Sequence, residues 1–75
     1  MRTRLVVARI RDLDPGAKVI HQDGSHQKWR LTTGASIVVP IHSRDLPIGT
    51  LRSIERQGES SFGYGWLRGA GGRLS

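Results

Sequence analysis

Three residues in one short segment carry the side chains that cleavage of a nucleic acid backbone requires. Residues 22–29 read QDGSHQKW, and His26, Lys28 and Arg30 stand at alternate positions. Because side chains of a strand alternate between its two faces, these three share one face if the segment is a strand. Imidazole is the side chain best suited to proton transfer at neutral pH, and the two cations can neutralise a phosphate. We therefore treat His26 as a candidate acid–base residue.

The chemistry that fits this set is attack of an RNA 2′-hydroxyl on its own phosphodiester. The reaction needs a base for the hydroxyl proton, a proton donor for the leaving 5′-oxygen, and cations to spread the phosphorane charge. One positioned acid or base contributes roughly 10²–10⁴-fold in rate. A lone histidine on a basic strand is also typical of an ordinary surface, so this pattern alone leaves both interpretations open.

No cofactor or metal is expected from the sequence. The three histidines, His21, His26 and His42, lack the spacing of a zinc site and are more typical of surface positions. The glycines near the C-terminus do not form the GxxxxGK[ST] loop that binds nucleotide phosphates. Cysteine is absent, which excludes disulfides and cysteine-ligated zinc.

Charge and composition narrow the choice of partners. Twelve lysines and arginines against six acidic residues give a net charge of +6 on 75 residues, enough for one domain. Such a balance favours polyanions, and we favour nucleic acid over a merely solvated basic surface. No apolar run approaches the roughly 18 residues of a membrane span, and no signal peptide pattern is present. We expect a cytoplasmic protein with no membrane partner.

The periodicity predicts a helix, three strands and a second helix. Residues 3–13 fit a helix with Thr3 as N-cap and Val6, Ile10 and Leu13 on one face, although a strand over residues 5–10 is the alternative. Strands are predicted at residues 17–22, 25–31 and 36–39, with Asp23-Gly24 as a hairpin turn and Pro40 ending the third. Residues 50–57 predict a helix that Gly58 terminates. The expected fold is therefore α+β, in αβββα order, with both helices on one face of a three-stranded antiparallel sheet.

The alternation of the second strand predicts which face is open. Trp29 and Leu31 are worth burying, at about 1.5–3 kcal/mol each when fully removed from water. Burying them beneath the helices leaves His26, Lys28 and Arg30 on the uncovered face. A turn at Asp23-Gly24 pairs His26 with His21, which then faces the same way. The core is assigned to Trp29, Leu31, Ile37, Val39, Leu51 and Ile54.

The composition changes after the second helix. Residues 59–75 are glycine-rich and aperiodic, so the domain is assigned to residues 1–58 and the remainder to a mobile tail. A terminus without function is the favoured interpretation. The alternative is a segment that stacks on unpaired bases through its interleaved aromatic and basic residues, Phe62, Tyr64, Trp66, Arg68 and Arg73.

Residues 16–58 resemble the HicA family, the small mRNA interferase toxins of bacterial toxin–antitoxin pairs. Three motifs in the family's order carry the resemblance. The first is Gly24-Ser25-His26 followed by the aromatic Trp29. The second is Val39-Pro40-x-His42, and the third is Leu46-Pro47-x-Gly49-Thr50-Leu51-x-x-Ile54.

The resemblance implies a fold like that of double-stranded-RNA-binding domains, with His26 as the catalytic histidine. It also implies a HicB-type antitoxin that covers the sheet and silences the enzyme. His42 matches a recurrent family position, and we interpret it as structural, anchoring the loop after Pro40. On this view mRNA lies on the sheet face: Lys28 and Arg30 hold the scissile phosphate, His21 lies beside them, Gly24 permits the tight turn and Ser25 orients the histidine.

Two other classes of protein are also consistent with the sequence. A small basic RNA-binding module with no catalytic activity has the same fold and charge. A ribosome-associated or antitoxin-bound structural protein is the third possibility.

Overall fold

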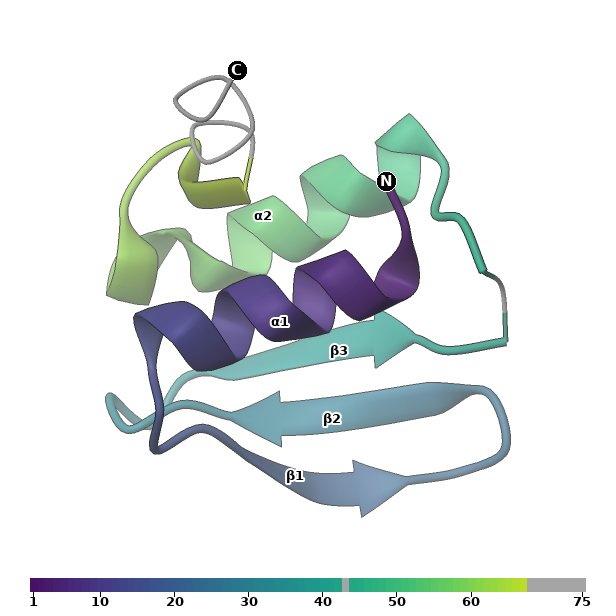
Figure 1. Cartoon of the computed structure of the whole chain (residues 1–75). Coiled ribbons are helices and arrows are strands. Elements are labelled where there is room, and N and C mark those ends of the chain that lie inside the picture. The colour runs from purple at the N-terminus through teal and green to yellow at the C-terminus, as the bar shows by residue number, and fades with distance from the viewer. Residues whose placement is uncertain (43, 68–75) are drawn as a thin grey trace.

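The computed structural model describes residues 1–42 and 44–67, in five elements. They are α1 (Thr3–Leu13), β1 (Lys18–Gln22), β2 (His26–Arg30), β3 (Ser36–Pro40) and α2 (Ile48–Phe62). The strands form one antiparallel sheet in the order β1-β2-β3, and both helices lie on the same face of it (Figure 1). The predicted αβββα fold of the α+β class is confirmed.

Helix α1 covers the range predicted for it, and the alternative of a strand there is wrong. Val6 and Ile10, one turn apart, are fully buried against the sheet, whereas Leu13 is exposed. Thr3 is not the N-cap: Arg2 holds that position and makes no side-chain capping bond. The Thr3 backbone N–H donates to the Arg44 carbonyl at 2.9 Å, so tertiary structure satisfies one of the donors at the start of the helix that have no partner within it.

The core lies between the helices and the inner face of the sheet. Five of the six predicted core residues are buried, and Leu51 is partly buried against them. Trp29 is central: its indole is 2% exposed, and the Arg11 guanidinium carbon of α1 lies 5.4 Å from the ring centroid. The core also contains five residues that were not assigned to it, namely Val6, Ile10, Leu46, Trp66 and Leu67.

Gly58 does not end α2, contrary to the prediction. The helix continues to Phe62, and Gly63, with φ of 92°, follows it as C-cap. Gly58 is buried in the helix because the indole of Trp66 rests on it. A Cβ at this position would lie only 2.8 Å from Trp66 Nε1. The glycine serves close packing here rather than backbone conformation.

The described part of the expected tail, residues 59–67, belongs to the domain, so the boundary at residue 58 is too early. The Trp66 Nε1–H donates to the Glu55 carbonyl at 2.7 Å, and the Leu67 N–H donates to Glu55 Oε2 at 3.2 Å. Phe62 packs edge-on against Trp66 with ring centroids 5.0 Å apart. These two rings are therefore core residues rather than base-stacking ones. Arg68 and Arg73 lie outside the described residues.

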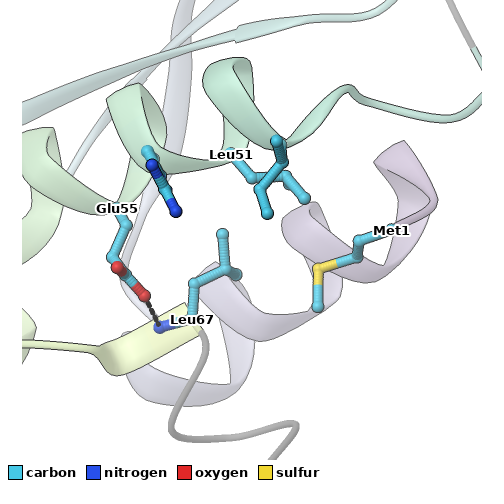
Figure 2. Close-up of a pocket in the computed structure, with 6 residues that line it drawn as sticks. Met1, Leu51, Glu55 and Leu67 are labelled. Carbon is cyan, nitrogen blue, oxygen red and sulfur yellow. Dashed lines mark hydrogen bonds between the residues drawn. The ribbon is translucent and has the colours of Figure 1, made fainter.

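An apolar hollow lies between the chain's N-terminus, α2 and the turn at Leu67. Figure 2 shows Met1, Leu51 and Leu67 converging on it, with Glu55 bonded to Leu67 at its rim. Its volume is about 110 Å³, and none of its lining residues belongs to the sheet. The hollow is therefore separate from the strands that carry the candidate catalytic residues.

Candidate active site

The β1–β2 hairpin turns one residue later than predicted. The Asp23 N–H donates to the His26 carbonyl at 3.1 Å, so Gly24 and Ser25 form the tip. Gln22 then pairs with Gln27 and His21 with Lys28, and the predicted pairing of His26 with His21 is wrong. The cause is the Asp23 carboxylate: its Oδ1 accepts the N–H of Ser25 and the N–H of His26, both at 2.8 Å. An aspartate that binds the backbone two residues on creates its own turn.

Gly24 was expected to permit the tight turn, but the structure does not give it this role. Its φ is not among the positive values found in the described chain, and a Cβ there would meet nothing within 4 Å. The turn therefore does not need glycine for its backbone conformation. What glycine provides is a tip with no side chain beside Ser25 and His26.

The predicted orientation of β2 is confirmed. His26, Lys28 and Arg30 are exposed, whereas Trp29 is buried beneath the helices. Directly opposed residues of antiparallel strands lie on the same face, and β1 opposes His21 to Lys28 and Lys18 to Arg30. The uncovered side of the sheet thus carries a set that we call the basic face: Lys18, His21, His26, Lys28 and Arg30.

Lys18 belongs to this face although sequence reasoning did not place it there. In a regular strand Lys18 and His21 would point to opposite faces, because their positions differ by an odd number. The pairing shifts between Val19 and His21, so one extra residue resets the alternation. No residue of β1 marks this bulge in the sequence.

The His26 ring is held at one nitrogen and exposed at the other side. Its Nδ1 lies 2.9 Å from Ser25 Oγ, which lies 3.3 Å from Asp23 Oδ1. An ionised carboxylate only accepts, and a serine hydroxyl has one proton to give. If Ser25 donates to Asp23, the imidazole must donate Nδ1–H to Ser25. We assign the Nδ1 proton from the hydrogen-bond pattern, and in the neutral ring this tautomer leaves Nε2 as the unprotonated base.

The exposed edge of the ring is available to a substrate. The His26 side chain is 48% exposed, and within residues 1–42 and 44–67 its ring makes no hydrogen bond other than that to Ser25. About half of the side chain is therefore open to solvent, and the rotation of the ring is restrained at Nδ1. This is the geometry of a general base oriented by a neighbouring group, found in catalytic triads.

The Asp23 carboxyl at the hairpin tip is stabilised in its ionised form. The backbone N–H of Ser25 and then that of His26 hold the pKa of Asp23 below its ordinary value of 3.8. The Ser25 hydroxyl and the charge of the nearby imidazole, with Nδ1 3.8 Å from Oδ1, act in the same direction. Asp23 is thus an acceptor for the Ser25 hydroxyl at all pH values near neutrality.

His42 lies beside His26. The two ring centroids are 6.1 Å apart with their planes inclined by 54°, and His42 is exposed. The loop after Pro40 is anchored by the backbone, since the Ile41 N–H donates to the Ser25 carbonyl at 2.7 Å. Across the described residues the His42 ring makes no hydrogen bond, so it does not provide the anchoring role that the sequence suggested for it.

Two further observations concern other kinds of site. Among the residues that the structure describes, no three histidine, aspartate or glutamate side chains gather as a metal-binding group. No helix in the same residues is long and apolar enough to cross a membrane.

Comparison with known proteins identifies a family. The model of the family described as HicA toxin of bacterial toxin–antitoxin systems matches residues 13–59, which is more than half of the chain. The match contains the whole sheet, both histidines of the ring pair and most of α2. No curated protein and no solved structure gives a significant match. The chain therefore belongs to the HicA toxin family of bacterial toxin–antitoxin systems, as its three motifs predicted.

Proposed function

We propose that the protein is an endoribonuclease toxin that cleaves mRNA on its basic face, with His26 as the catalytic residue. Toxins of the HicA family are mRNA interferases, which gives the reaction class. The observation that carries the assignment to one residue is the exposed His26 ring, restrained at Nδ1 by Ser25 and on the same sheet face as the cations of the basic face.

In the proposed reaction, His26 Nε2 removes the proton of a 2′-hydroxyl as its oxygen attacks the adjacent phosphorus. The hydrogen-bonded chain from Nδ1 through Ser25 to Asp23 keeps the ring in the required tautomer and stabilises the imidazolium that forms. The bond from phosphorus to the 5′-oxygen then breaks. No metal or cofactor takes part in these steps.

Lys28 and Arg30 neutralise the phosphate during this step. Side chains two residues apart on a strand are separated by about 7 Å, so His26 and Lys28 can reach one nucleotide together. A charge-assisted hydrogen bond from either cation is stronger for the doubly charged phosphorane than for the ground state. His21 and Lys18 extend the same surface toward neighbouring phosphates, and the side-chain-free Gly24 leaves room for the RNA beside the tip.

The proposed partner is a HicB-like antitoxin that covers the basic face. Membership of a toxin–antitoxin family implies an antitoxin. An acidic or substrate-like surface that contacts the cations of the sheet would block RNA and His26 at once. We place this activity in the cytoplasm, where mRNA is available.

Incubation of purified protein with labelled RNA tests the proposal. His26→Ala is expected to lower the cleavage rate by about 10²–10⁴-fold while the circular dichroism spectrum stays unchanged. His21→Ala is the matched control, because it removes an exposed imidazole from the same face and should affect cleavage far less. Chelators should leave the rate unaltered. Full cleavage by folded His26→Ala would overturn the catalytic assignment.

The same experiment separates the enzyme from an RNA-binding module. Binding that leaves every RNA intact would favour the module, because folds of this kind also bind duplex RNA through its shape and phosphates. Co-expression with the neighbouring reading frame should relieve growth arrest and yield a stable complex. Growth arrest that persists in the presence of every neighbouring protein would contradict the antitoxin proposal.

A further inference from the structure

A groove beside the hairpin tip carries a second cluster of cations. It has a volume of about 590 Å³ and is lined by Arg2, Thr3, Arg4, Ile41, His42 and Arg44. We propose that this groove binds backbone phosphates in the part of the bound RNA strand that extends beyond the active site. The inference rests on the proposed function and extends the RNA path beyond the sheet, to arginines that neither the motifs nor the family match assign.

Backbone pairing between distant segments builds the groove. Arg2 forms a bridge with Asp45, the Thr3 N–H donates to the Arg44 carbonyl at 2.9 Å, and the Leu46 N–H donates to the Met1 carbonyl at 2.9 Å. The start of α1 is therefore fixed against the loop between β3 and α2. Guanidinium groups from two segments that are distant in the sequence are held around one hollow.

No arginine of the groove forms an ion pair with a carboxylate of the described residues. In the described part of the chain, the ion pairs are Arg9 with Asp12 and His26 with Asp23, and neither involves an arginine of the groove. Three guanidinium groups that share a groove without carboxylate partners repel one another, so an anionic ligand is favoured there. The planar fork of arginine matches phosphate oxygens in particular.

The groove is continuous with the candidate active site. His42 lines it and lies 6.1 Å from the His26 ring, and the neighbouring Ile41 is bonded to the Ser25 carbonyl. An RNA strand on the basic face therefore passes His26, then His42, and meets the arginines next. This continuity is why we assign RNA rather than an unrelated anion to the groove.

Binding measurements in the His26→Ala background test the groove independently of cleavage. Arg4→Gln combined with Arg44→Gln should weaken RNA binding and flatten the plot of log affinity against log salt by about 0.7 for each phosphate that the protein no longer neutralises. The matched control is Arg52→Gln with Arg56→Gln, which removes the same charge from α2. Unchanged affinity and slope in the groove variant, or equal reductions in both variants, would overturn the proposal.

Cleavage kinetics with active protein complete that test. The groove variant should raise KM several-fold with a much smaller change in kcat, because neither imidazole is replaced. A lower kcat with unchanged KM would contradict a phosphate-binding groove. Since binding is measured without catalysis, failure of the proposed nuclease function would appear separately, as intact RNA with the wild-type protein.

The ring pair supports a second inference of its own: we infer that His42 is the general acid of the same reaction. Cleavage needs a base on one side of the phosphorus and a proton donor on the other, and two imidazoles 6.1 Å apart can flank one phosphate. The tautomer set by Ser25 assigns His26 as the base. His42 then gives its proton to the 5′-oxygen as the P–O5′ bond breaks, yielding a 2′,3′-cyclic phosphate and a free 5′-hydroxyl.

Charged groups surround His42 on two sides. Arginines of the N-terminal segment and of its own loop line the groove, and the hairpin tip presents an imidazole and a carboxylate: Arg2, Arg4, Arg44, His26 and Asp23. His42 is thus shared between the ring pair and the groove. Both inferences therefore give the strand the same direction. The nucleotide that carries the leaving 5′-oxygen lies on the side of the groove.

A substrate whose leaving oxygen is replaced by sulfur distinguishes an acid from a structural residue. The substrate is a DNA oligonucleotide with a single ribonucleotide, which fixes the cut, and a 5′-thiolate leaves without needing a proton. His42→Ala should lose about 10²-fold on the oxygen substrate and recover nearly all of it on the sulfur substrate. His26→Ala should stay impaired on both. Equal impairment of His42→Ala on both substrates, or full activity on the oxygen substrate, would exclude His42 as the acid.

Discussion

Two aspartates of this protein make similar turns with opposite consequences. Asp14, after α1, accepts the Gly16 N–H at 3.2 Å and both the N–H and the hydroxyl of Thr32 at 2.7 and 3.1 Å. Asp23, after β1, accepts bonds from Ser25 and His26, which are two and three residues away. Asp14 is 8% exposed and joins turns that are distant in the sequence, whereas Asp23 is exposed and bonds only within its own tip.

The difference shows how one side chain can serve either the fold or the site. A buried acceptor whose donors come from a distant turn adds stability, because its removal breaks the hydrogen bonds that hold the two turns together. An exposed acceptor within one turn adds little stability, since water can replace it, but it fixes the atoms next to it. Asp14 therefore belongs to the scaffold, and Asp23 to the positioning of His26.

The largest expected effect is on stability, from Asp14→Ala. The Thr32 N–H and hydroxyl would lose their acceptor, at a cost of about 2–3 kcal/mol in the free energy of unfolding. A domain of this size has a net stability of only about 3–5 kcal/mol, so the variant would lose a large part of its free energy of unfolding. Urea unfolding followed by circular dichroism measures the change. Asp12→Ala is the exposed control. An equal loss of stability in both variants would contradict the assignment of Asp14 to the scaffold.

Asp23→Ala is expected to act on cleavage instead. With Asp23 gone, the Ser25 hydroxyl loses the acceptor that directs its lone pair to His26, and the rate of RNA cleavage should fall about tenfold. Ser25→Ala should have a similar effect, and the double variant little more, because both act through one chain of hydrogen bonds. Asp23→Asn retains an acceptor oxygen and should recover part of the rate. A thermal midpoint that falls as far as that of Asp14→Ala would contradict the distinction.

The smallest expected effect is the response of the hairpin tip to acid. Because the pKa of Asp23 is lowered in the folded protein, its contribution to the tip is complete above its ordinary value of 3.8 and is lost as the pH falls through the lower folded value. The amide resonances of Ser25 and His26, followed by NMR in an acid titration, should move with a midpoint below 3.8. A midpoint at or above the ordinary value would mean that the two backbone bonds do not persist in solution.

The sequence was sufficient for elements that depend on local periodicity. The apolar spacing of Val6 and Ile10 predicted α1, and the alternation of Trp29 with Lys28 predicted the open face of β2. Both signals act within a few residues, so no knowledge of the tertiary fold was needed.

The features that were missed depend on contacts between segments or on competing local bonds. The turn at Asp23 follows its side chain rather than the preference of the Asp-Gly pair, and the bulge in β1 has no marker in the sequence. Gly58 was expected to end the helix because the local sequence does not show that the indole of Trp66 packs on it. The groove could not be predicted because pairing of Arg2 with Asp45 is what brings its two sides together.

The positions of the two tryptophans have a practical consequence. Trp29 lies in the middle strand and Trp66 in the turn after α2, and both indoles are at most 4% exposed. The intrinsic fluorescence of each indole therefore reports on a different part of the molecule. A Trp→Phe replacement at either position leaves a single tryptophan, so the order in which the chain end and the sheet open under denaturant can be followed by tryptophan fluorescence without any added label.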